Sequence, residues 1–358
     1  MAKVRVGIVG MGWGQLQIES FRRARDAEVV ALCDLDQARL EQVAAQHKIA
    51  KTFTNYQELI AGDAIDLVSI ASPPDWHEPM VRGAIDAGKH VLCEKPLALN
   101  ARTSRELLDC AQARGIVHAV DSEMRFLPAL AYCKELIDEE YLGQLLRVDV
   151  TMAMARPWGE HGNWAADDAR GGGILLELGA NYIDILRWWF GDVSAVLAGR
   201  RTHFSTMRVR KPAGTTGDSF ENRLVTGDDA FWSVLQFARG GEALLSFVSG
   251  TRHDPGWTIS AYGSQGSLVV SSGQLVGMRE GDSEMAVLPV PRRLEVGDNP
   301  RDPLMWSMAK LAERMIAKVN GARDTQPFPD FRDAVAVENI VGAIRRASDE
   351  CAWVERWL

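Results

Sequence analysis

Glu94, Lys95 and Pro96 stand directly after a short apolar run at residues 90–93. The run predicts a buried strand, and the proline predicts a rigid turn after it. A carboxylate and an ammonium therefore stand at the end of a strand, the edge at which open parallel sheets bind ligands. Lys95 could accept a proton from a bound substrate while Glu94 holds it in place. The alternative is a solvated ion pair before a turn proline.

A glycine-rich turn follows the apolar run at residues 4–9 and consists of Gly10, Met11, Gly12, Trp13 and Gly14. Glycines between a strand and a helix let the backbone approach a pyrophosphate, whose charge is stabilised by the amides at the helix N-terminus. The usual spacing places a third glycine at position 15, where this chain has Gln15. The alternative is an ordinary tight turn between a strand and a helix.

Asp34 ends the second apolar run and lies 24 residues after Gly10 (34 − 10). A carboxylate at this place accepts hydrogen bonds from the adenosine ribose hydroxyls of a dinucleotide. A 2′-phosphate would be repelled by Asp34 and by Asp36 two residues later. The sequence therefore predicts NAD, in preference to NADP, as the cofactor.

The first third of the chain alternates predicted strands and helices, which would bring these groups to one sheet edge. Strands are predicted at residues 4–9, 29–33, 67–70, 90–93 and 116–120, and helices at 18–25, 36–47, 56–61, 76–87 and 101–114. Buried strands that alternate with helices in this way predict an α/β fold with a doubly wound parallel sheet.

The second half of the chain has a different order of predicted elements, in which most strands follow one another without helices between them. A helix at residues 125–139 and a strand at 146–155 precede a run of strands joined by glycine-rich turns, at 193–200, 230–237, 243–248, 257–261 and 267–270. Helices follow at 303–320 and 334–347. The pattern predicts a mainly antiparallel sheet.

The segment 156–173 predicts a loop that is rich in aromatic and charged side chains, namely Trp158, His161, Trp164, Asp167, Asp168 and Arg170. Indole faces cover the C–H faces of a sugar, and neighbouring polar groups can pair with its hydroxyls. The alternative is a surface loop held down by its two tryptophans.

Residues 174–190 are apolar nearly all round and predict a buried helix. Glu177, Asn181 and Asp184 recur on it at spacings of four and three, which places them in one stripe. Buried carboxylates are costly unless they are paired or face a polar cavity, so the stripe predicts a site. In the alternative, Asp184 pairs with Arg187 and Glu177 caps the glycine-rich entry.

Composition limits the class of protein. The 358 residues suffice for about two domains, and 46% hydrophobic with 25% charged residues is typical of a globular protein. A formal net charge of −8 argues against nucleic acid and anionic membranes as partners. Five cysteines without close pairing fit a reducing compartment and exclude a thiolate zinc site, and the start of the chain shows no signal sequence. We expect a cytoplasmic protein that binds small molecules and no metal.

Together these motifs resemble the Gfo/Idh/MocA family, which includes glucose-fructose oxidoreductase and inositol dehydrogenase. The resemblance rests on the Gly10 turn, Ala71-Ser72-Pro73-Pro74 with His77, Gly88-Lys89-His90-Val91 before Glu94-Lys95-Pro96, Arg125-Phe126 with Pro128, and Gly171-Gly172-Gly173. It implies a NAD-binding domain at 1–124 with the C-terminal helix 331–358 packed on it. It also implies a substrate-binding domain at 125–330, whose open, mainly antiparallel sheet builds a homodimer or homotetramer.

The resemblance further implies that Lys95 is the catalytic-site lysine and that Ser72 and Pro73 lie near the nicotinamide. We expect His77 and Glu94 beside the cofactor. Substrate contacts are expected from Arg125, Trp158, Trp164 and Asp184. Family members commonly carry aspartate and histidine where this chain has Glu177 and Asn181. An amide does not titrate near neutrality, so Asn181 cannot replace the histidine as an acid-base group.

The resulting hypothesis is a NAD-dependent oxidoreductase that acts on a secondary hydroxyl of a sugar, cyclitol or related polyol. Lys95, Glu177 and Asn181 are its predicted catalytic residues. One alternative is an enzyme that uses bound NAD transiently for sugar elimination or isomerisation. A second is a NAD-binding regulator without catalysis.

Overall fold

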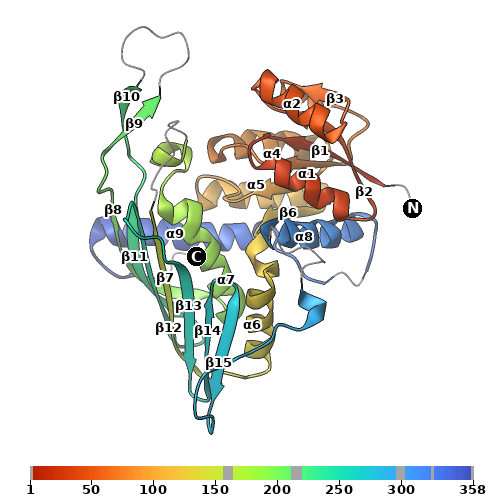
Figure 1. Cartoon of the computed structure of the whole chain (residues 1–358). Coiled ribbons are helices and arrows are strands. Elements are labelled where there is room, and N and C mark those ends of the chain that lie inside the picture. Colours follow the sequence, from red (N-terminus) through yellow and green to blue (C-terminus); the bar gives the residue numbers. More distant parts are fainter. Residues whose placement is uncertain (1–2, 156–163, 211–219, 296–302, 324–325, 356–358) are drawn as a thin grey trace. The chain divides into compact units, whose positions relative to one another are not determined.

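The computed structural model describes residues 3–155, 164–210, 220–295, 303–323 and 326–355. Contacts within the chain group it into two compact units (Figure 1). The first comprises Met1–Leu127 and Val296–Ala336, and the second comprises Pro128–Glu295 and Val337–Leu358. Within the described residues, no helix is long and apolar enough to cross a membrane.

The first unit contains a six-stranded sheet in the order β3-β2-β1-β4-β5-β6, and every neighbouring pair is parallel. The strands are β1 Val4–Val9, β2 Ala27–Cys33, β3 Lys51–Phe53, β4 Leu67–Ile70, β5 His90–Glu94 and β6 His118–Asp121. This arrangement confirms the predicted doubly wound sheet. The short strand β3 was not predicted, because its three residues are largely exposed and carry no apolar run.

Helices cover both faces of this sheet. They are α1 Gly14–Arg23, α2 Gln37–His47, α3 Tyr56–Ile60, α4 His77–Asp86, α5 Ala101–Arg114 and α8 Pro303–Val319. Apolar side chains of α1, α2 and α8 form one core layer. The helices α3, α4 and α5 form the other, together with the first turns of α9, Phe331–Glu350. The chain therefore returns to the first unit after passing through the second.

The second unit is built on a nine-stranded sheet in the order β16-β15-β14-β13-β7-β12-β11-β8-β17. Only β7 and β12 pair in parallel among these described strands, which confirms a mainly antiparallel sheet. The strands are β7 Leu145–Met154, β8 Val193–Arg201, β11 Ala230–Phe237, β12 Glu242–Ser249, β13 Gly256–Gly263, β14 Gly266–Ser271, β15 Gln274–Arg279, β16 Ala286–Val287 and β17 Val354–Glu355. A separate hairpin pairs β9 Thr206–Arg210 with β10 Phe220–Leu224.

Alternation along these strands decides which face of the large sheet is buried. In β11 the side chains of Phe231, Ser233, Leu235 and Phe237 are buried, whereas Trp232 is 49% exposed. The buried face packs against helices, among them α7 Ala180–Phe190, whose Tyr182 meets Phe247 edge-on. Helix α6, Pro128–Asp138, also belongs to this unit.

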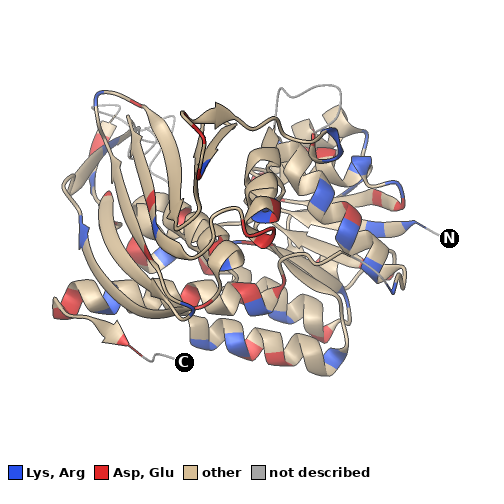
Figure 2. Cartoon of the chain, turned by 90° about the horizontal axis from the view of Figure 1, so that it is seen from below, with Lys and Arg blue, Asp and Glu red and all other residues tan. Residues whose placement is uncertain are grey.

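The C-terminal helix contributes to both units. Its first turns place Phe331 and Val335 in the first unit's core. Beyond Ala336 its contacts belong to the second unit, where Ser348 accepts a hydrogen bond from the Arg200 backbone amide on β8. Figure 2 shows that Lys and Arg residues are interspersed with Asp and Glu residues along the helices.

Candidate active site

The glycine turn after β1 has the geometry that a pyrophosphate site requires. Gly10 has φ +95°, and a Cβ there would lie 2.5 Å from the Ala71 carbonyl oxygen at the end of β4. Gly12 faces open space, with no atom within 4 Å of a Cβ. A Cβ on Gly14 would lie 3.0 Å from the Ile8 side chain. Gly14 therefore provides the close packing of helix on strand that the third glycine usually provides, one residue early.

Asp34 holds this turn from the neighbouring strand. One oxygen of its carboxylate accepts a hydrogen bond from the Met11 backbone amide at 2.6 Å, and the other accepts from the Asp36 amide at 2.8 Å. A carboxylate offers about four acceptor sites, so further sites remain for ribose hydroxyls. The Arg39 guanidinium lies 3.9 Å from Asp34 and 3.0 Å from Asp36, where it is paired with a carboxylate. These residues fit a NAD-type ribose.

His77 joins two loops at the same sheet edge. Its ring nitrogens lie 2.6 Å from the Pro96 carbonyl oxygen and 2.8 Å from that of Ser72. Burial lowers the pKa of His77, and the two carbonyl contacts oppose this effect. The imidazole thus fixes Ser72 relative to the Lys95–Pro96 peptide, which is cis. Ser72 and Pro73 are half-buried at this edge, so they remain accessible to a ligand.

Lys95 follows Glu94, the last residue of β5, so the strand ends one residue later than predicted, and the side chain of Lys95 is half-buried. Glu94 points instead into a buried polar cluster. Gln17 of α1 donates to Glu94 at 3.3 Å and to Asp121 of β6 at 3.1 Å. Burial is the largest cause that raises the pKa of Glu94 well above its usual range, and the Asp121 and Glu123 carboxylates add to it. Sequence reasoning missed Gln17 and Asp121, because only the register of β5 and β6 places Glu94 beside Asp121.

Arg125 lies in the first unit and is buried. Its guanidinium pairs with Asp333 of α9 at 3.0 Å. This ion pair connects the segment that carries Arg125 to helix α9. The expected contact between Arg125 and the substrate stays a prediction.

The helix that carries the polar stripe begins with a π-helical turn, Leu175–Gly179, and continues as α7. Glu177 lies in the π-helical turn, and single turns of this kind are frequent at functional sites. Glu177 and Asn181 are half-buried, whereas Asp184 is buried. The Arg187 guanidinium donates a hydrogen bond at 2.9 Å to Asp192, which lies beyond the end of α7.

Asp228 caps the start of this helix. Its backbone carbonyl accepts from the Ile174 amide at 2.8 Å, and its side chain accepts from the Leu175 amide at 3.0 Å. Burial raises the pKa of Asp228 to about 6, although the backbone hydrogen bond and nearby Arg200 and Arg345 lower it. In the alternative interpretation of the sequence, Glu177 caps this entry, whereas in the structure the cap is made by Asp228, about fifty positions later.

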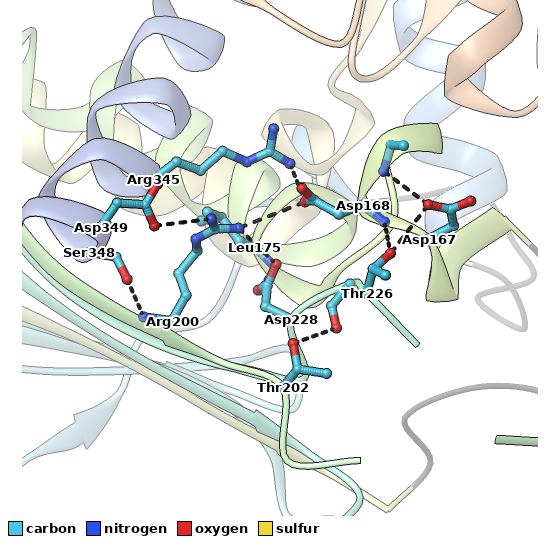
Figure 3. A network of polar contacts seen from close by, with 12 residues as sticks. Asp167, Asp168, Leu175, Arg200, Thr202, Thr226, Asp228, Arg345, Ser348 and Asp349 are labelled. Carbon is cyan, nitrogen blue, oxygen red and sulfur yellow. Dashed lines mark hydrogen bonds and ion pairs between the residues drawn. The ribbon is translucent and has the colours of Figure 1, made fainter. Parts of the chain in front are cut away.

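Asp228 belongs to a network of charged residues (Figure 3). Arg200 of β8 lies 3.7 Å from Asp228, 3.7 Å from Asp168 and 3.8 Å from Asp349. Arg345 of α9 pairs with Asp168 at 2.9 Å. Through Asp168, the network connects the candidate substrate loop to β8 and to the C-terminal helix α9. These ion pairs hold the described end of that loop in place.

The three consecutive glycines are explained by close contacts around this cap. Gly171 ends a 3-10 turn with φ +85°. A Cβ on Gly172 would lie 2.4 Å from the Ala165 carbonyl oxygen, and one on Gly173 would lie 2.3 Å from the Asp228 carboxylate. The run therefore lets the chain pass close to Asp228 before the helix begins.

The rest of the candidate substrate loop is described in part. Trp158 and His161 lie outside the described residues. Trp164 begins a 3-10 turn, Trp164–Ala166, and is half-buried. Asp167 accepts from the Ala169 amide, and Thr226 donates to Asp167 at 3.3 Å. No three His, Cys, Asp or Glu side chains in the described part of the chain are placed to hold a metal ion.

Comparisons with known proteins agree with this geometry. Residues 4–122 match a family model described as the oxidoreductase family, NAD-binding Rossmann fold, and residues 130–269 match the GFO/IDH/MocA C-terminal domain. An uncharacterized oxidoreductase of Synechocystis is 29% identical over 367 residues, covering 98% of this chain and 95% of that protein. Levoglucosan dehydrogenase of Pseudarthrobacter phenanthrenivorans is 28% identical over 248 residues, covering 64% of this chain and 61% of that protein.

The fold is also that of solved structures. A levoglucosan dehydrogenase in complex with NADH and levoglucosan has a TM-score of 0.86 at 21% sequence identity, and the match covers 99% of each chain. At this identity the likeness shows the shared fold.

Proposed function

This chain belongs to the Gfo/Idh/MocA oxidoreductase family, and we propose that it is a NAD-dependent dehydrogenase of a sugar, cyclitol or related polyol. It would oxidise a secondary hydroxyl, with Lys95 as the group that takes or orients the hydroxyl proton. Bound NAD would supply the acceptor for the hydride.

The observation that carries the proposal is the place of Lys95 in the first unit. It follows β5, next to β4 in the sheet, and β4 leads into the Ser72 loop. His77 bridges that loop to Pro96, so Lys95 and Ser72 are held at the same edge as the glycine turn. Ligands of doubly wound sheets bind at this edge, where the strand order reverses.

Three features support NAD as the cofactor. Gly12 leaves space for a pyrophosphate, and Trp13 adds no side-chain cap to the start of α1, whose amides can then meet phosphate oxygens. The Asp34 carboxylate is suited to ribose hydroxyls and would repel a 2′-phosphate. The levoglucosan dehydrogenase of the same fold was solved with NADH.

A sugar-like substrate is supported by the loop and helix of the second unit. The half-buried indole of Trp164 offers an apolar face, and Glu177 and Asn181 offer hydrogen-bonding groups. The levoglucosan dehydrogenase relative acts, by its name, on an anhydrosugar. We assign Asn181 to orienting substrate hydroxyls, because an amide cannot exchange a proton near neutrality. The Glu177 carboxylate would position the substrate or relay the proton.

The test is reduced-nicotinamide absorbance when the purified protein and NAD meet a panel of sugars, anhydrosugars, cyclitols and uronic acids. Lys95→Ala is measured beside the wild type, and Lys89→Ala is the control. Lys89 is a lysine of the same unit, and its ammonium is used by the carbonyl oxygens of Gly62 and Ile65. Lys95→Ala should lower turnover by about two to four powers of ten if Lys95 transfers the proton.

Other outcomes would change the conclusion. Turnover of Lys95→Ala within a few-fold of the wild type would remove Lys95 from the proton path. Consumption of a sugar without net NADH would indicate internal recycling of the cofactor. If no compound of the panel is converted while NADH still binds, the result would favour a NAD-binding regulator without catalysis.

A further inference from the structure

Four buried polar side chains form a connected cluster behind Lys95. The Ser69 hydroxyl of β4 donates to the Gln17 side-chain oxygen at 2.7 Å. The Gln17 amide nitrogen then donates to Glu94 and to Asp121, which are neighbours in the register of β5 and β6. All four residues are at least nine-tenths buried. The amide therefore uses both of its hydrogens on two carboxyl groups that water does not reach.

One oxygen of this cluster has no donor. Oδ1 of Asp121 is buried and accepts no hydrogen bond from the described residues. A buried acceptor without a donor is costly, and two carboxylates in one dry site repel each other. A proton held by either carboxyl group removes both problems, because a protonated carboxyl donates a hydrogen bond.

We propose that Glu94 and Asp121 share one proton and that this pair receives the proton which Lys95 takes from the substrate hydroxyl. The inference rests on the proposed function. It gives the reaction a second proton acceptor within the first unit. Asn181 of the second unit cannot serve as that acceptor, because its amide does not titrate.

The proposed proton transfer conserves atoms, electrons and charge. The substrate O–H bond breaks and an N–H bond forms on the Lys95 amine, while the C–H electron pair leaves as hydride to the nicotinamide. An N–H bond of Lys95 then breaks, and an O–H bond forms on the carboxyl oxygen of the pair that is still ionised. The pair changes from one negative charge to none, and Lys95 returns to its starting state. The stored proton leaves for solvent before the next turnover.

The charged groups around the pair fit this role. Burial, then the Asp121 and Glu123 carboxylates, raise the pKa of Glu94, while the Lys95 charge lowers it. Burial raises the pKa of Asp121 to about 6, and hydrogen bonds from Glu94 and Gln17, with the Lys95 charge, lower it. Helix α1 contributes Gln17, which is uncharged, and β4 contributes Ser69. The pair is therefore able to hold a proton at neutral pH.

The first experiment follows one turnover by stopped flow, with NADH absorbance and a pH indicator recorded together. In the wild type, proton release to solvent should lag behind NADH formation, because the proton is first stored. The double variant E94Q/D121N keeps the shape and hydrogen bonds of both side chains but cannot hold the proton. It should show no lag, and its rate of NADH formation should fall at least tenfold.

Glu123→Gln is the matched control, because it makes the same chemical change at a neighbouring buried carboxylate outside the pair. It should retain the lag, because both carboxyl groups of the pair remain, although loss of the Glu123 charge lowers the pKa of Glu94. Far-ultraviolet circular dichroism should be unchanged in every variant, which separates loss of proton storage from loss of the folded structure. Simultaneous proton release and NADH formation in the wild type would overturn the transfer.

The second experiment needs no turnover. The infrared difference spectrum of wild type minus E94Q/D121N at pH 7.5 should contain the carbonyl stretch of a protonated carboxyl group. Its absence would overturn the shared proton. If the wild type oxidises no compound of the panel, the proposed function fails and the transfer fails with it, whereas the infrared band still decides whether the pair holds a proton.

Discussion

The side chain of Asp228 accepts a hydrogen bond from the backbone amide of Leu175 at 3.0 Å, across 53 positions of sequence. The contact caps the helix that carries Glu177 and Asn181. It joins that helix to Arg200 through the same carboxylate, and Arg345 pairs with Asp168 in the same network. The geometry of the predicted substrate-binding helix therefore depends on one buried acid.

Asp228 should make stability depend on pH. Burial raises its folded-state pKa to about 6 from an ordinary value of 3.8, so the folded protein holds this proton more tightly than the unfolded chain. The contribution is fully present below about pH 4 and is lost as the pH rises through 6. Between pH 5 and pH 8 the wild type should lose about 1.4 kcal/mol relative to Asp228→Asn. Urea unfolding at both pH values measures this difference, and an unchanged difference would contradict it.

Gly173→Ala should destabilise the protein through its contact with Asp228. Gly173 has φ +103°, and a Cβ there would lie 2.3 Å from the carboxylate. Gly240 is the control, since it has φ +93° with no atom within 4 Å of a Cβ. We expect a loss of about 1 to 2 kcal/mol for Gly240→Ala from the backbone alone, and about 2 kcal/mol more for Gly173→Ala. Equal losses in urea unfolding would show that the close contact costs nothing.

Asp34→Asn should weaken the preference for NADH over NADPH. The amide oxygen of asparagine can still accept the Met11 hydrogen bond, so the glycine turn is kept while the negative charge is removed. The ratio of the NADPH to the NADH dissociation constant should fall about tenfold, equivalent to about 1.4 kcal/mol. Asp86→Asn is the control, because it makes the same chemical change at an exposed aspartate, the last residue of α4. Titration calorimetry with both cofactors gives the ratio, and a wild type that binds NADPH more tightly would refute the NAD assignment.

Trp232→Lys should reduce oligomerisation. The indole is 49% exposed on the face of β11 opposite to its buried side chains, and it lies over Gly199 of β8, where a Cβ would be 2.6 Å from the ring nitrogen. Half-buried Val234 and Leu244 share this face. Apolar sheet faces of this kind mark association sites. The mass measured by light scattering should fall from that of a dimer or tetramer to that of the monomer, whereas Trp353→Lys should leave it unchanged.

Local sequence patterns predicted much of the fold. The bounds of β1, β4, α5 and β11 agree with the predicted ranges. The strands are mostly apolar runs or a clear alternation, and α5 has one buried face between the caps Asn100 and Gly115. Such patterns report burial directly. The strands β3, β9, β10 and β15 were missed. Their segments are short, polar or interrupted by glycine, so they become strands only by pairing with a neighbour.

The sequence by itself determined the ligand-binding chemistry at the strand ends. Gly10, Asp34 and Lys95 could be placed at one edge, because the carboxyl ends of parallel strands always share an edge. What only the tertiary structure decided is how acids are held in the interior. Asp121 meets Glu94 through strand register, and Asp228 reaches Leu175 from a distant loop. No periodicity along the chain encodes such contacts, since their strength comes from burial that many segments create together.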